Sequence, residues 1–142
     1  GAPFLPTRKK HLDIFDHIGL QPGMTFVDMG SGDGRLVFEA AKRGALARGI
    51  EIQPVLHVYS KLKQYFHPNK QHIKFLKQDF WKHDVSDADV VFIFFIQSKM
   101  DKMKNKLEKE LQSGSRVVSH IFTIPDWQYT KKHGSMYVYH RD

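Results

Sequence analysis

The sequence of 142 residues predicts an α/β fold: a doubly wound, mostly parallel Rossmann-like sheet with a short antiparallel C-terminal edge. Three observations support this prediction. Apolar runs that can be strands alternate with amphipathic runs that can be helices. A glycine-rich turn follows the first of these strand runs. The run from Val90 to Phe95 is continuously apolar, as is typical of a central strand in a parallel sheet.

The elements are expected in a regular order within one domain, residues 1–142. Thr7 can cap an N-terminal helix, which ends in the glycines and proline of residues 19–23. Strands are predicted at 24–29, 45–52, 72–76, 90–95 and 117–122. Helices are predicted at 35–43 and 55–66, and a third helix has Met100, Met103, Leu107 and Leu111 on its inner face. Residues 124–127 and 136–140 are expected to form the antiparallel edge, with 131–135 as the hairpin turn.

Composition limits the classes of function. The chain has no cysteine, which excludes disulfides, thiolate metal sites and a cysteine nucleophile, and its nine histidines show no metal-ligand spacing, so no metal site is predicted. No run is long enough to span a membrane and no signal peptide opens the chain, so we expect a cytoplasmic protein. The net charge of +7 fits a nucleic acid or an anionic membrane surface, or else is surface chemistry only, which we favour.

The glycine turn, Gly30-Ser31-Gly32-Asp33-Gly34, is the main candidate binding element. A dinucleotide fingerprint would need its third glycine where Arg35 stands, and no Gly-Lys-Ser/Thr of a P-loop follows. The carboxylates of Asp28 and Asp33 would repel a pyrophosphate. They suit a ligand with cationic groups and hydroxyls, such as S-adenosylmethionine.

Acidic residues also follow the next two predicted strands. Glu51 stands seventeen residues after Gly34, where a carboxylate can accept both hydroxyl protons of a ribose; the alternative is an exposed acid at a strand end. Asp79 can accept from an adenine amine while Phe80 or Trp81 lies against the ring, although the same residues could form a turn with a buried aromatic.

Taken together, these motifs resemble those of class I S-adenosylmethionine-dependent methyltransferases. The N-terminal Pro3-Phe4-Leu5-Pro6-Thr7, the run 100–107 and Phe122-x-x-Pro125-x-Trp127 narrow the resemblance to small protein-lysine methyltransferases related to the enzyme that acts on the ATP synthase c-ring protein, including archaeal broad-specificity enzymes. The resemblance implies transfer of methyl groups to lysine ε-amines of a protein substrate. It also implies that residues 1–23 supply a lid segment and helix. The cofactor-binding residues expected from motif and resemblance are Phe4, Pro6, Thr7, Asp28, Gly30, Ser31, Gly32, Asp33, Gly34, Glu51, Ile52, Gln53, Asp79, Phe80 and Trp81.

The acceptor side carries fewer signals. A lysine must lose its proton before methylation, and apolar walls from Phe95 and Trp127 would favour the neutral amine while Thr7 or a water takes the proton. Phe94 can serve the same purpose or belong to the core. Two positions depart from the family pattern, Gln97 in place of proline and Ile121 in place of arginine. The alternatives are an RNA or small-molecule methyltransferase and a non-catalytic module that keeps the cofactor fold.

Overall fold

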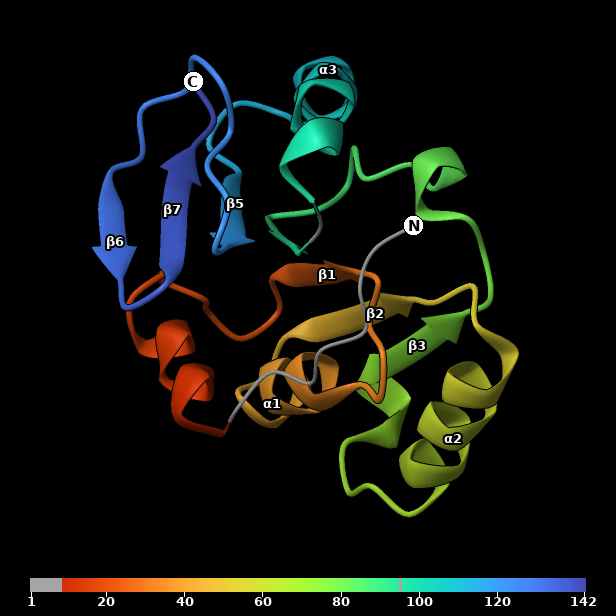
Figure 1. Cartoon of the computed structure of the whole chain (residues 1–142). Coiled ribbons are helices and arrows are strands. Elements are labelled where there is room, and N and C mark those ends of the chain that lie inside the picture. Colours follow the sequence, from red (N-terminus) through yellow and green to blue (C-terminus); the bar gives the residue numbers. More distant parts are fainter. Residues whose placement is uncertain (1–8, 95) are drawn as a thin grey trace.

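A computed structural model describes residues 9–94 and 96–142. These residues form a seven-stranded sheet with the order β3-β2-β1-β4-β5-β7-β6 (Figure 1). Strands β1 to β5 are parallel, β7 is antiparallel to β5, and β6 is antiparallel to β7. The predicted doubly wound sheet with an antiparallel C-terminal edge is therefore confirmed.

The strand order reverses between β1 and β4, the point at which doubly wound folds bind ligands. The strands are β1 (Thr25–Met29), β2 (Leu46–Ile50), β3 (Ile73–Leu76), β4 (Val90–Ile93), β5 (Arg116–His120), β6 (Lys131–His133) and β7 (Met136–His140). The α-helices are α1 (Arg35–Lys42), α2 (Pro54–Tyr65) and α3 (Met100–Glu110). Four 3-10 helices complete the described elements: η1 (Lys9–Asp16), η2 (Lys70–His72), η3 (Phe80–Lys82) and η4 (Gln97–Lys99).

The sheet separates two apolar cores. On one face, side chains from η1 and α1 pack with Phe26, Phe92 and Val118 of the sheet. On the other face, Met100, Met103 and Leu107 of α3 pack with alternate residues of the same strands. These three α3 residues and Leu111 are buried, as their helical spacing predicted. Helix α2 lies beside the edge strand β3, at one end of the sheet (Figure 1).

Three predicted elements differ from the structure. The first described helix is a 3-10 helix rather than an α-helix, because apolar spacing in so short a segment does not distinguish the two. The edge strand is β6, not residues 124–127, and only residues 134–135 turn the hairpin. Strand β5 ends at His120 and not at 122, because Ile121 has a positive φ of 74° and turns the chain back.

No helix in the described part of the chain is both long and apolar enough to cross a lipid bilayer.

Candidate functional site

The glycine turn connects β1 to α1 at the carboxyl edge of the sheet. Gly30, Gly32 and Gly34 all have positive φ, a conformation that other residues rarely adopt. The N–H groups of Gly30 and Ser31 donate to the Ile50 carbonyl at 2.8 and 2.9 Å, which fixes the turn against the end of β2. At Gly34 a Cβ would lie 2.8 Å from Phe75 Cζ and 2.9 Å from Phe38 Cε2. The backbone can therefore hold a tight turn that leaves room for a ligand.

Three carboxylates surround this turn, although the chain as a whole is basic. Asp28 is only 3% exposed. Burial is the main cause that raises the pKa of Asp28 well above its ordinary value, and the nearby carboxylates of Glu51 and Asp33 add to the effect. Asp33 is paired with Arg35, whose Nε lies 2.8 Å from Asp33 Oδ2. A buried acid among acids favours a cationic ligand, because a positive group would relieve their mutual repulsion.

Glu51 follows β2 and joins the glycine turn to α2. Its Oε1 accepts from the Gly32 N–H at 2.8 Å, and its Oε2 accepts from the Gln53 N–H at 3.0 Å. The Gln53 side chain in turn accepts from the Leu56 N–H at 2.7 Å and caps α2. The carboxylate thus stands at the strand end where the sequence predicted it, and Ile52 beside it is exposed.

The segment after β3 supplies an acid and two aromatic rings. Asp79 Oδ1 accepts from the Trp81 N–H at 3.0 Å and caps η3. The rings of Phe80 and Trp81 lie 5.1 Å apart, both are half-buried, and Lys102 Nζ lies 4.2 Å from the centre of the Trp81 ring. Because β1, β2 and β3 are parallel neighbours, Asp28, Glu51 and Asp79 come from the same edge of the sheet.

Two residues that support the turn were missed from the sequence. Ser60, in α2, is fully buried, and its Oγ donates to the Gly32 carbonyl at 3.1 Å. Lys63, one turn later in the helix, donates through Nζ to the Asp33 carbonyl at 3.3 Å. A serine and a lysine in a helix ordinarily indicate a solvated face, so no sequence signal marked either one.

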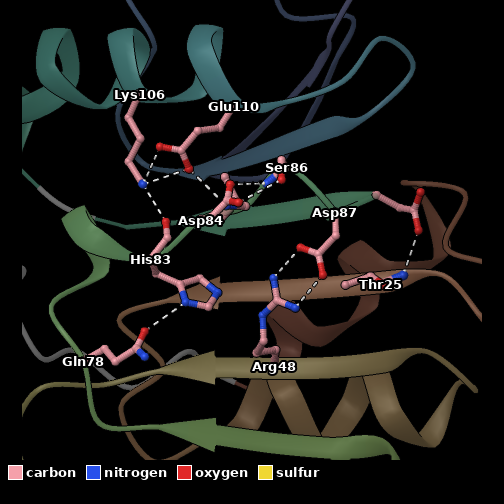
Figure 2. Close-up of polar contacts among 11 residues, drawn as sticks. Thr25, Arg48, Gln78, His83, Asp84, Ser86, Asp87, Lys106 and Glu110 are labelled. Atoms are coloured by element: carbon pink, nitrogen blue, oxygen red, sulfur yellow. Dashed lines mark hydrogen bonds and ion pairs between the residues drawn. The ribbon is translucent and has the colours of Figure 1, made fainter.

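A polar network fixes the segment that carries Asp79 against α3 and the sheet (Figure 2). Lys106 Nζ lies 2.7 Å from Glu110 Oε2 and donates to the His83 carbonyl at 2.5 Å, and Glu110 Oε1 accepts from the Val85 N–H at 3.0 Å. Figure 2 shows these groups between α3 and the underlying strands, and also the pair of Arg48 with Asp87. Burial, with Arg48 next in effect, lowers the pKa of His83. The neutral ring is therefore favoured within the network.

The acceptor-side predictions fare differently. Phe4, Pro6, Thr7 and Phe95 lie outside the described residues. Phe94 is half-buried, packs on the first core and has its ring 4.9 Å from that of the buried His120.

Trp127 is not brought to the glycine turn. Its Nε1 donates to Glu108 at 3.2 Å, and its ring lies 6.0 Å from that of Tyr139 in a hollow of about 410 Å³ at the C-terminal edge. Glu108 is eight residues beyond Met100 in α3, or about 12 Å along the helix axis. The position of Trp127 therefore does not support the predicted role as an acceptor wall.

Among residues 9–94 and 96–142, no three His, Asp or Glu side chains are arranged as metal ligands. The acidic cluster thus has the composition to hold a cationic organic ligand.

Comparison with known proteins gives a consistent family. Residues 28–131 match the family described as the ANTKMT methyltransferase domain. The chain is 36% identical over 126 residues to the human lysine N-methyltransferase of the ATP synthase c-ring protein, covering 88% of this chain and 54% of that protein. It is 33% identical over 131 residues to a protein-lysine N-methyltransferase of Saccharolobus islandicus, covering 89% of this chain and 80% of that protein. The chain thus spans about half the length of the human relative.

A solved structure has a similar fold over nearly all of its length. It is that of an RNA methyltransferase from Salinibacter ruber in complex with S-adenosyl-L-homocysteine. The TM-score is 0.88 at 29% identity, and the match covers 96% of this chain and 92% of the other.

Proposed function

The chain belongs to the ANTKMT methyltransferase domain family, and from this premise we propose that it transfers methyl groups from S-adenosylmethionine to the ε-amine of lysine in a protein substrate. The observation that carries the cofactor is the cluster of Asp28, Asp33 and Glu51 around the glycine turn at the switch point of the sheet. The acceptor class follows from the lysine methyltransferases among the relatives. The predicted cytoplasmic location stays a prediction, which cell fractionation tests.

Each part of the edge has a proposed binding task. Asp28 and the glycine turn bind the methionyl end, where the buried carboxylate balances a cation. Glu51 accepts from the ribose hydroxyls, which requires it to exchange one or both of its present backbone donors. Asp79 and the ring of Phe80 bind the adenine. When bound, the cofactor supplies a methyl group on a positively charged sulfur.

The remaining task of the chain is to orient the acceptor amine and keep it neutral. An ammonium has no lone pair, so its proton must leave first, and an apolar surrounding favours the neutral amine by disfavouring the charged one. Phe94 lies at the end of β4 beside His120 of β5, and the exposed Ile96 and Ile121 follow the same two strands. We assign these apolar side chains to the mouth of the acceptor site. Proposed roles for Thr7 and Phe95 stay predictions.

The test is a labelling experiment. The chain is incubated with tritiated S-adenosylmethionine and a cell extract, and the product is divided between protease and ribonuclease. We expect label that protease releases, that ribonuclease leaves intact and that mass spectrometry places on lysine. The Asp28→Asn variant is the matched control and should give no label. Label on other residues only, or the same labelling by this variant, would contradict the proposal.

RNA methylation is the second candidate, because the structurally similar Salinibacter ruber protein is an RNA methyltransferase and this chain has a net charge of +7. Label released by ribonuclease would favour it. A chain that binds no S-adenosylhomocysteine in calorimetry would favour the non-catalytic module and would contradict both enzyme proposals.

A further inference from the structure

Helix α2 has its polar side inward and its apolar side outward. Of the residues in this helix, only Ser60 is buried. A surface helix ordinarily shows the reverse arrangement, with an apolar stripe toward the core and polar side chains in water. The orientation of α2 therefore needs an explanation on both of its sides.

Hydrogen bonds explain the inner side. Ser60 and Lys63 donate to the Gly32 and Asp33 carbonyls of the glycine turn. Gln64 Nε2 donates to the carbonyls of Lys70 and Ile73, at 3.0 and 2.8 Å. The polar side of α2 thus satisfies backbone acceptors of the turn and of the segment that leads into β3.

The outer side is apolar and uncovered among the described residues. Its large side chains, each between 50% and 77% exposed, recur along the helix and its C-cap; they are Val55, Val58, Tyr59, Leu62, Tyr65 and Phe66, here called the α2 stripe. They account for six of the eleven exposed large apolar side chains in the described part of the chain. In Figure 1 no described element lies over the outer side of α2. A continuous apolar strip of this kind indicates an interaction surface.

The charge around the α2 stripe is all of one sign. Residues 52–78 contain five lysines and no aspartate or glutamate. Lys63 Nζ lies 5.3 Å from the centre of the Tyr59 ring, and Lys70 Nζ lies 5.2 Å from that of Tyr65, so ammonium groups adjoin the apolar side chains themselves. Lys61, Lys70, Lys74 and Lys77 are exposed.

We propose that the α2 stripe and its surrounding lysines dock the protein on the surface of an anionic lipid bilayer. Apolar and aromatic side chains enter the boundary between headgroups and acyl chains, while the lysine ammonium groups remain among anionic headgroups. Each lysine near such a surface strengthens binding about fivefold. This inference goes beyond the proposed function and does not depend on it.

Other occupants fit the observations less well. A second copy would bring the same lysines face to face, and a stable dimer buries about 800 Å² per partner from some 20–30 residues, far more than one helix stripe offers. A nucleic acid would match the charge but would leave the apolar side chains beside phosphates. The bilayer is the occupant that satisfies both features.

Docking has a consequence for the crevice. Helix α2 begins three residues after Glu51 and is twelve residues, or about 18 Å, long. A bilayer that covers α2 therefore lies within about one helix length of the glycine turn, and favours acceptors held at a membrane surface.

Vesicle flotation tests the proposal with the unaltered chain. We expect flotation with vesicles of phosphatidylcholine and phosphatidylserine, weaker flotation with phosphatidylcholine alone, and loss of binding at high salt. The double variant Leu62→Glu, Phe66→Glu should bind at least about tenfold less. Lys61→Ala with Lys70→Ala should lose about fivefold per lysine. The matched control is Tyr129→Glu, an exposed aromatic on the opposite end of the sheet, which should float as the parent does.

Retained S-adenosylhomocysteine binding shows that each variant is folded, and it separates failure of docking from failure of the proposed function. Equal flotation with neutral and anionic vesicles, or unchanged flotation of the Leu62/Phe66 variant, would overturn the proposal. So would a dimer in sedimentation that the same variant dissociates, because the α2 stripe would then belong to a second copy.

Discussion

The two crossover helices beside β2 are oriented in opposite ways. Helix α1 buries Leu36, Val37, Ala40 and Ala41 in the first core, as an amphipathic helix should. Helix α2 buries a serine and exposes its apolar stripe. The two helices flank the same glycine turn, so the difference arises from what each contributes to it.

Helix α1 continues directly from the turn, and its apolar face needs only to cover the sheet. Helix α2 approaches the turn from the side and provides the donors that the Gly32 and Asp33 carbonyls accept. Buried carbonyls without donors are costly, so the polar side of α2 faces inward. Its apolar stripe is then left for another surface.

The largest test of this contrast compares matched leucines. Leu36→Ala in α1 should lower the free energy of unfolding by about 2–5 kcal/mol, because it leaves a cavity in the core. Leu62→Ala in α2 should change it by less than about 0.5 kcal/mol, because the side chain is exposed. Urea denaturation measures both. Similar losses in the two variants would mean that α2 is covered in the folded chain.

The acid beneath the turn should affect binding and stability in opposite directions. Asp28→Asn removes the charge that balances a cationic ligand, so we expect S-adenosylhomocysteine affinity to fall about 10- to 100-fold, as for a lost hydrogen bond to a charged group. The same change should stabilise the ligand-free protein at neutral pH. Calorimetry and urea denaturation measure the two effects, and a destabilised variant would contradict the second.

The pH dependence follows from the raised pKa of Asp28. Because the folded state holds this proton more tightly than the unfolded state, the stability that protonated Asp28 confers is present below its ordinary pKa and is lost as pH rises toward the raised value. The advantage of Asp28→Asn should therefore vanish in acid. Ligand affinity should rise with pH over the same window, since the ionised carboxylate binds the cation.

Much of the site was predictable because its acids follow strands. Asp28, Glu51 and Asp79 come from neighbouring parallel strands, and parallel strand ends meet at one edge whatever the details of packing. The glycines were predictable for a similar reason, since their positive φ angles are intrinsic to the turn.

The orientation of α2 was not predictable in this way. Its apolar positions have helical spacing and would ordinarily indicate a core face. The preference of Ser60 for the interior depends on a carbonyl 28 residues away, and no local pattern reports it. Trp127 was misplaced for a related reason, because positive φ angles at Ile121 and Asp126 direct the chain after β5 along α3.

A smaller effect is expected in α3, where the segment bearing Asp79 is also held by polar groups. Lys106→Met would leave the partly buried Glu110 without its cation, and should lower the free energy of unfolding by about 1–2 kcal/mol. The matched control is Lys104→Met, whose partner Asp126 is largely exposed, and which should cost less than about 1 kcal/mol. Equal losses would show that the network in Figure 2 does not stabilise the segment.

The smallest expected effect tests the inner side of α2 directly. Ser60→Ala removes one donor from the Gly32 carbonyl, at a cost of about 0.5–1.5 kcal/mol, while Ser113→Ala, at an exposed turn, should cost almost nothing. Because Gly32 also donates to Glu51, the loss should weaken S-adenosylhomocysteine binding several-fold as well as stability. Weaker stability with unchanged affinity would mean that Ser60 only packs α2 against the sheet. A paired loss would mean that α2 faces inward with its polar side because the turn must be held for the ligand.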